Sequence, residues 1–213
     1  MKRFIIAAFA ASTALLATPA QAVQLIPGSS IDLAGFVRAL GSATLGGATG
    51  LDFLAGPASE ASPGVAGNIN TYGNGTGSLA GINCSGGNCG SIIDVTNLTV
   101  GAQNIANFFT LSGGNNTAPV FFDLTSISDI NRSNPNFLTF TAQGNIRYST
   151  FDPTAATFLF SAQGTTTTSF SATAIANPVP EPAVWAMMLF GFGGLGYSMR
   201  RRPKQTVRVR YAA

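Results

Sequence analysis

Apolar and polar residues alternate along short runs between residues 91 and 177. The alternation is clear in Phe158-Leu159-Phe160-Ser161 and in Phe170-Ser171-Ala172-Thr173-Ala174. A period of two, with many Phe and Thr residues, predicts strands that bury one face. Asn134-Pro135-Asn136 and Asp152-Pro153-Thr154 fall between such runs and are typical of turns. The pattern predicts an all-β fold, and we expect an antiparallel β-sandwich or jelly roll over residues 23–177.

The first part of this region has a weaker pattern. Residues 41–90 hold fourteen glycines, which indicate turns and loops. Apolar residues recur among them, so we favour ordered loops between short strands, with disorder as the alternative. Residues 31–40 fit either a strand or a short helix, and Gly35 in the middle of the segment favours the strand.

One short motif occurs twice. Phe140-Thr141-Ala142-Gln143-Gly144 is followed twenty residues later by Phe160-Ser161-Ala162-Gln163-Gly164. We expect the two copies to be successive strands that end in equivalent turns.

The chain begins with the three parts of a secretory signal peptide. Met1-Lys2-Arg3 is basic, residues 4–16 are apolar, and Ala20-Gln21-Ala22 is a small-x-small cleavage pattern. The pattern predicts export through the secretion translocon and cleavage after Ala22 by signal peptidase. Residues 1–22 are therefore left out of the expected mature fold.

A second apolar run, residues 183–199, carries no charge and is followed directly by Arg200, Arg201 and Arg202. As a helix it reaches about 26 Å, the short limit for a bilayer core, and excess Lys and Arg are typical of the cytoplasmic side. We expect a transmembrane helix at 183–199, stop-transfer arginines and a basic cytoplasmic tail at 200–213. A buried core helix is the alternative.

A proline-rich segment, residues 178–182, precedes this run. Pro178, Pro180 and Pro182 favour an extended backbone, which holds Glu181 on a stiff stalk where a processing enzyme can grip it. The segment and the helix after it share a set of residues with PEP-CTERM proteins of the PEPxxWA variant, which the chain resembles over residues 179–203. These residues are Val179, Pro180, Glu181, Pro182, Trp185, Ala186, Gly191 and Gly193.

The resemblance implies a Gram-negative exported protein whose partner is an exosortase, a membrane enzyme that cuts near the motif. The body would then be released or transferred to the cell surface from an inner-membrane-anchored precursor with a periplasmic ectodomain. Such families often accompany exopolysaccharide production. Related tails are sometimes labelled an ice-binding protein C-terminal domain, a label that does not by itself imply ice binding.

Four glycines in the C-terminal run, Gly191, Gly193, Gly194 and Gly196, fit the dinucleotide fingerprint GxGxxG. That fingerprint needs a preceding strand and a later acid, and the sequence offers neither. Small residues that let a partner helix approach closely are the better interpretation, and the resemblance makes the exosortase the expected partner.

The charged residues and the lack of histidine exclude some classes of function for the exported body. The formal net charge is +3, but residues 23–182 hold three arginines against all eight acids, a net charge of −5. Nucleic-acid binding is disfavoured, because phosphate contacts need clustered cations. The chain has no histidine, which excludes Ser-His-Asp and Cys-His arrangements within it. We expect no enzyme and no cofactor.

The two cysteines, Cys84 and Cys89, are predicted to form a disulfide in an oxidising compartment. Two reduced, buried thiols are the alternative. A zinc site would need further Cys or His ligands, which the sequence lacks.

Two functional hypotheses remain. The first is a structural or interaction protein of the cell surface or extracellular matrix, linked to exopolysaccharide or biofilm. The alternative is a carbohydrate- or ice-binding module that uses a Thr/Asn-rich face, including the hydroxyl run Thr165–Ser169. A flat array of threonines would favour the alternative, and a convex, mixed surface would favour the first. A hydrolase is a distant third, with Asp123 and Asp129 as the nearest pair of carboxylates.

Overall fold

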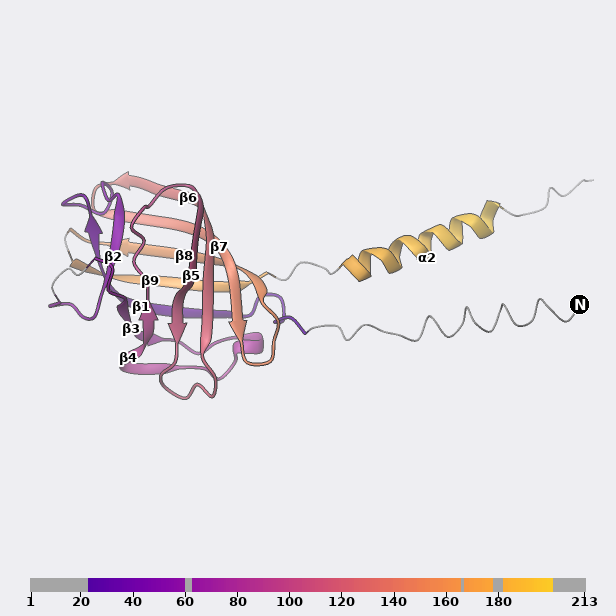
Figure 1. Cartoon of the computed structure of the whole chain (residues 1–213), viewed down its shortest axis with the longest axis horizontal. Helices are drawn as coiled ribbons and strands as arrows, with labels where there is room; N and C mark the ends of the chain where they lie inside the picture. The colour runs from indigo at the N-terminus through magenta and orange to yellow at the C-terminus, as the bar shows by residue number, and fades with distance from the viewer. Residues whose placement is uncertain (1–22, 60–62, 166, 178–181, 201–213) are drawn as a thin grey trace, which may run out of the picture. The chain divides into compact units, whose positions relative to one another are not determined.

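The computed structural model describes residues 23–59, 63–165, 167–177 and 182–200. The chain divides into two compact units, residues 1–178 and 179–213, and each is described by itself. The described residues of the first unit form one antiparallel sheet of nine strands and a short 3-10 helix, η1 (Figure 1). The elements are β1 (Ser30–Leu40), β2 (Gly50–Leu54), β3 (Gly67–Tyr72), η1 (Gly77–Leu79), β4 (Cys84–Ile92), β5 (Gly101–Leu111), β6 (Val120–Asn134), β7 (Phe137–Tyr148), β8 (Thr154–Gln163) and β9 (Thr167–Ala176).

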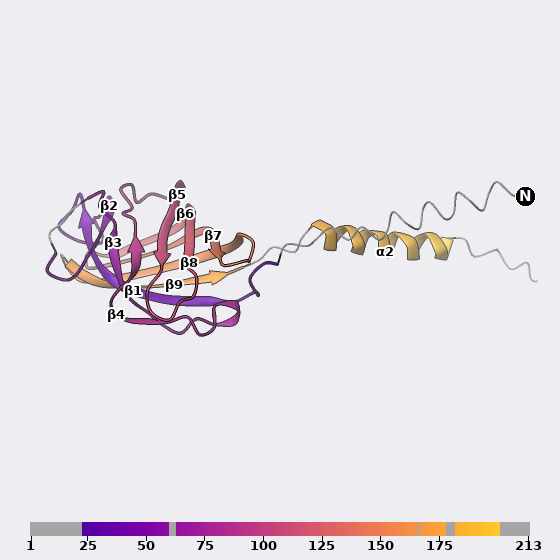
Figure 2. The ribbon, with the colours of Figure 1, turned by 60° about the horizontal axis from the view of Figure 1, so that its bottom comes forward.

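The sheet closes on itself because its first and last strands pair. Residues 30–38 of β1 pair with residues 167–175 of β9, and the order continues β1-β3-β4-β5-β6-β7-β8-β9. Within the part of the chain that the structure describes, eight strands therefore form a closed barrel, and β2 is an added ninth strand. Figures 1 and 2 show the strands wrapping around a common interior.

The all-β prediction is therefore confirmed, but the predicted β-sandwich or jelly roll is wrong. Alternation of apolar and polar residues is the same in a strand that faces a second sheet and in a strand that curls around a barrel. The strands from β5 to β9 are 10 to 15 residues long, which is longer than the short strands expected. Register shifts along β5, β6 and β7 add the bends that closure needs.

The core of the barrel is built mainly from phenylalanine. Phe108 on β5 makes edge-on contacts with Phe53 on β2 and with Phe158 on β8, at centroid distances of 6.0 Å and 5.3 Å. Alanines such as Ala142 and Ala174 fill the space between the rings and are fully buried. The set of buried rings comprises Phe53, Phe108, Phe109, Phe122, Phe140, Phe158, Phe160 and Phe170.

The described part of residues 41–90 is ordered into short strands and loops, as expected. Residues 31–40 lie in β1, so the strand interpretation is confirmed. Gly35 sits where a side chain would not fit, because a Cβ atom there would lie 2.8 Å from the Phe170 ring and 2.8 Å from the Asn68 carbonyl oxygen. This glycine lets β3 and a large core ring approach the same point of β1.

The added strand β2 is held by buried polar contacts on its outer edge. Leu51 exchanges two backbone hydrogen bonds with Val95, at 2.7 Å and 3.0 Å. Next to them, the buried carboxylate of Asp94 accepts hydrogen bonds from the backbone N–H groups of Phe53 and Gly64, both at 2.8 Å. Asp94 therefore takes the place of a neighbouring strand.

The two copies of the repeated motif lie on successive strands, as predicted, but they do not end in equivalent turns, so that part of the prediction is wrong. Phe140 and Phe160 are direct partners across β7 and β8. Gly164 follows the end of β8, but Gly144 lies in the middle of β7. A Cβ atom at Gly144 would overlap the Asp123 carbonyl oxygen and the Phe122 ring, so this glycine serves the close approach of β6 and not a turn.

The described part of the second unit is one helix, α2 (Pro182–Arg200). No helix among the described residues has the length and apolarity needed to cross a bilayer. The predicted transmembrane helix at 183–199 is therefore wrong, and the inner-membrane-anchored precursor that depended on it is not supported. Four glycines, together with Tyr197 and Ser198, dilute the apolar content of the run.

Candidate functional site

A polar network crosses three neighbouring strands on the outside of the barrel. Arg147 on β7 donates from Nε to Asp123 Oδ2 at 2.7 Å and from Nη2 to Asp123 Oδ1 at 3.1 Å. The same Nη2 donates to Asn107 Oδ1 on β5 at 2.5 Å, and the Asn107 backbone N–H donates to Asp123 Oδ1 at 2.8 Å. The guanidinium of Arg147 is thus fixed on two sides by partners from β5 and β6.

The electrostatics of this network favour both charged forms. Hydrogen bonds from Arg147 lower the pKa of Asp123, with a further lowering by the Asn107 N–H, and partial burial only opposes them. The hydrogen bond to Asp123 raises the pKa of Arg147. Asp123 and Arg147 therefore form a persistent, locally neutral pair at the surface.

Aromatic rings border this pair. The Arg147 guanidinium lies over the ring of Phe121, its cross-strand partner on β6, at 4.8 Å from the centroid. Tyr148 and Phe151 stack next to it, with ring centroids 6.2 Å apart and planes within 13°. These four side chains line a groove of about 420 Å³, together with Ala118, Pro119, Ser149 and Pro153.

Sequence analysis missed this groove. The available signal was Phe121, an aromatic residue at an outward position beside the buried Phe122, and Arg147, one of the three arginines in residues 23–182. Neither residue is unusual alone. The turn after β7, which brings Phe151 back beside Tyr148, is what assembles the site.

The hydroxyl-rich face predicted from the sequence lies across the outside of β7, β8 and β9. A second groove there, about 310 Å³, is lined on its polar side by Thr139, Thr141, Ser161, Ser171 and Thr173, with the exposed Leu159 among them. The face follows the curvature of a closed barrel and mixes hydroxyls with an exposed leucine. It is therefore curved and mixed and carries a groove, and it is not a flat array of threonines.

Thr166 lies outside the described residues, and the other hydroxyls of the run Thr165–Ser169 do not present one uniform surface. Thr167 accepts a hydrogen bond from Arg38 Nε at 3.2 Å, and the Thr168 hydroxyl donates to the Gln163 carbonyl. Further along β9, the Thr173 hydroxyl donates to Asp32 at 2.6 Å. Several hydroxyls of this face are thus engaged within the protein.

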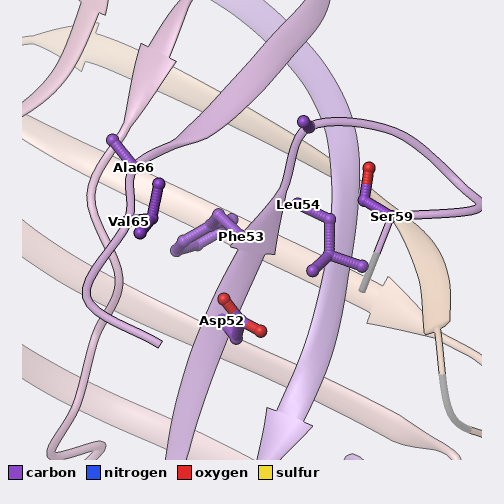
Figure 3. A pocket seen from close by; sticks show the side chains of 7 residues that line it. Asp52, Phe53, Leu54, Ser59, Val65 and Ala66 are labelled. Atoms are coloured by element: carbon purple, nitrogen blue, oxygen red, sulfur yellow. The ribbon is translucent and has the colours of Figure 1, made fainter. Parts of the chain in front are cut away.

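A third hollow, about 290 Å³, lies beside β2 (Figure 3). Its walls are mainly apolar and include Phe53, Leu54 and Val65, with Asp52 and Ser59 as the polar side chains. Asp52 pairs with Arg38 in the β1–β2 register. The described residues that line the hollow include no pair of acids and no nucleophile–base pair, so they favour packing of β2 over chemistry.

The carboxylates considered for hydrolysis are not brought together. Asp123 and Asp129 are six residues apart on the same strand, β6, which corresponds to about 20 Å along an extended strand. Glycosidases hold their two carboxyl groups within about 10 Å of each other. Asp123 is also committed to Arg147.

The predicted disulfide between Cys84 and Cys89 is confirmed. It closes an irregular part of β4 whose register with β3 is shifted. The loop at residues 112–115 packs on it, because the Ser112 and Gly113 N–H groups both donate to the Cys89 carbonyl. The Tyr72 hydroxyl donates to the Gly113 carbonyl from the other side. The disulfide therefore anchors the loop between β5 and β6.

The predicted sorting residues fall at the edge of what the structure describes. Val179, Pro180 and Glu181 lie outside the described residues, as do Arg201, Arg202 and the signal-peptide positions Ala20 and Ala22. Pro182 is the first residue of α2, Trp185 and Ala186 are in its first half, and Arg200 is its last residue. The four glycines follow in the second half, beside side chains such as Phe190 and Phe192 that are exposed in this unit.

The described residues define a protein of two parts, a closed all-β barrel and a separate C-terminal helical segment. A family model for the PEP-CTERM protein-sorting motif matches residues 178–202, so the C-terminal segment is similar to that motif. The match spans the predicted sorting residues, while the PEPxxWA subtype stays a prediction. No curated protein and no solved structure matched the chain. The motif implies an exported, surface-directed protein that an exosortase processes.

Proposed function

We propose that the barrel is a non-catalytic interaction module of the cell surface or extracellular matrix, delivered there by exosortase processing. The observation that carries this proposal is the sorting motif at residues 178–202, placed directly after a barrel that ends with β9 at Ala176. Because β9 completes the closed sheet, a cut near the motif removes no strand.

Two features of the barrel support an interaction role over catalysis. The carboxylates of Asp123 and Asp129 are too far apart to work as a pair, and the chain has no histidine to act as a base. The hydroxyl-rich face is curved and mixed, which favours a structural or matrix role over an ice-binding plane. A link to exopolysaccharide or biofilm follows from the resemblance to PEP-CTERM proteins and is part of the proposal.

The test is mass spectrometry of the C-terminus of the mature protein, in cells with and without the host exosortase. We expect a new C-terminus near Pro180–Pro182 only when the enzyme is present. Glu181→Ala should accumulate as uncut chain, because the extended Pro-Glu-Pro segment loses its charged side chain. Glu60→Ala is the matched control, since Glu60 is the other glutamate of the chain. Normal processing of Glu181→Ala would contradict the assignment.

A further inference from the structure

The groove beside Arg147 combines aromatic rings with a fixed guanidinium. Tyr148 and Phe151 contribute two nearly parallel rings, and both are partly buried against the core. Arg147 contributes a guanidinium held between Phe121, Asp123 and Asn107. A volume of about 420 Å³ falls in the usual range of ligand pockets, roughly 300–1,000 Å³.

The groove also keeps hydrogen-bonding capacity in reserve. Among the described residues, neither Nη1 of Arg147 nor the hydroxyl of Tyr148 has a hydrogen-bond partner, although Nε and Nη2 of Arg147 are both engaged. A guanidinium fixed by two of its nitrogens presents the third in a constant direction. The groove therefore offers two pre-positioned polar groups beside an aromatic wall.

We propose that this groove binds a neutral saccharide, with a pyranose ring against Tyr148 and Phe151 and sugar hydroxyls bonded to Arg147 Nη1 and the Tyr148 hydroxyl. A pyranose has apolar C–H faces and a rim of hydroxyls, so it needs an aromatic wall with polar groups at its edge. Rigid, amphipathic rings supply such a wall with little loss of side-chain entropy. Asp123 and Asn107 are positioning residues, because they hold the guanidinium.

The charges around the groove favour a neutral sugar over an acidic one. The charge of Arg147 is compensated by Asp123 at 2.7 Å. Asp152 follows Phe151 directly in the loop, and residues 23–182 carry a net charge of −5. An acidic saccharide would meet this excess of carboxylates without an uncompensated cation to balance it.

This inference rests on the proposed function in one respect: a protein of the extracellular matrix would meet polysaccharide there. Binding is tested on the purified full chain by isothermal titration calorimetry with maltohexaose, cellohexaose and mannohexaose, and with an alginate hexamer as the acidic counterpart. We expect at least one neutral hexasaccharide to bind more tightly than the alginate hexamer. Its affinity should change less than about twofold between low and high salt, since no net charge is neutralised.

Three variants test whether the saccharide binds in this groove. Phe151→Ala should weaken binding about tenfold, because it removes half of the aromatic wall. Tyr148→Phe keeps the ring and removes the hydroxyl, so it should weaken binding less than Phe151→Ala does. The fold of this variant should be unaffected. Leu159→Ala, in the groove on β7–β9, is the matched control and should bind as the parent does.

The proposal is overturned if none of the three neutral hexasaccharides binds, or if both Phe151→Ala and Tyr148→Phe bind as the parent does. Loss of binding in Leu159→Ala alone would move the site to the hydroxyl-rich face. If the chain is processed in cells but binds no sugar, the saccharide proposal is contradicted and the sorting assignment stands. If the chain binds sugar but is never cut, the sorting assignment is contradicted and the saccharide proposal stands.

Discussion

Phe140 and Phe160 face each other across β7 and β8, with ring centroids 4.6 Å apart and planes within 20°. Both rings are buried, and Phe160 also stacks on Phe170 of β9 at 5.4 Å. Three consecutive strands are therefore joined by one row of rings on the inside of the barrel. The two copies of the repeated motif lie side by side because of this pairing.

Removing a ring from this row should be costly. We expect Phe160→Ala to lower the free energy of unfolding by about 3–5 kcal/mol, because it leaves a cavity between Phe140 and Phe170. Urea unfolding of the purified protein measures the change. Leu159→Ala is the control on the same strand. Because Leu159 is 42% exposed, this variant should lose far less free energy of unfolding. Equal losses in the two variants would contradict the inward placement of Phe160.

The buried carboxylate of Asp94 gives a second prediction. Asp94→Asn should lower the free energy of unfolding by about 1–3 kcal/mol, because one of the two backbone N–H groups of Phe53 and Gly64 would face an amide N–H₂ group. Hydrogen exchange should report the same change as faster exchange of the Phe53 amide. Asp129→Asn, on the exposed part of β6, is the control and should change neither measurement.

The Arg147–Asp123 pair predicts a small dependence of stability on pH. The folded-state pKa of Asp123 lies below its unfolded value of about 3.9, chiefly because Arg147 donates hydrogen bonds to the carboxylate. The pair therefore adds stability that is complete above that value and is lost as the pH falls through the folded-state pKa.

The Arg147 side chain is 38% exposed, so solvent screening should keep this contribution below about 1 kcal/mol. Asp123→Asn should be slightly less stable than the parent at neutral pH, and the difference should shrink below about pH 4. Urea unfolding at a series of pH values measures it. A difference that stays constant down to pH 2 would count against the ion pair as its cause.

The disulfide should stabilise the fold locally. The Cys84–Cys89 bond closes a short ring, for which the loss of chain entropy in the unfolded state corresponds to about 2 kcal/mol. Cys84→Ser with Cys89→Ser should lower stability by about that amount and should loosen the loop at residues 112–115. Limited proteolysis of the double variant would show new cuts there. Addition of a reductant to the parent should reproduce both effects.

Several strands could be predicted from the sequence. The alternation around Phe158 and Phe170 predicts β8 and β9. Asn134-Pro135-Asn136 predicts the turn between β6 and β7, and Asp152-Pro153-Thr154 predicts the turn between β7 and β8. The closure of the sheet could not be predicted in this way. It depends on pairing between residues 30–38 and 167–175, which are far apart in the chain and carry no local signal of each other.

Of the two candidate sites, only the C-terminal sorting motif could be predicted from the sequence. The PEP motif is a contiguous string of residues, so it is readable without a fold, and the family match covers it. The groove is assembled from β6, β7 and the loop after β7, and its aromatic residues look like ordinary core residues in the sequence. The predicted transmembrane helix at 183–199 is wrong because the length and lack of charge of the run do not offset its dilution by glycine.

The pairing of β1 with β9 also determines how the barrel responds to traction. Near the end of the pairing, Gly28 donates to Ala176 at 2.9 Å and Ala176 donates to Ser29 at 2.8 Å, so the chain enters and leaves the barrel at the same rim. The two strands are antiparallel, and a pull between residues 28 and 177 would load their hydrogen bonds one after another, as in an opening zipper. The barrel should therefore peel open at low force from this rim while the phenylalanine rows farther around it still hold.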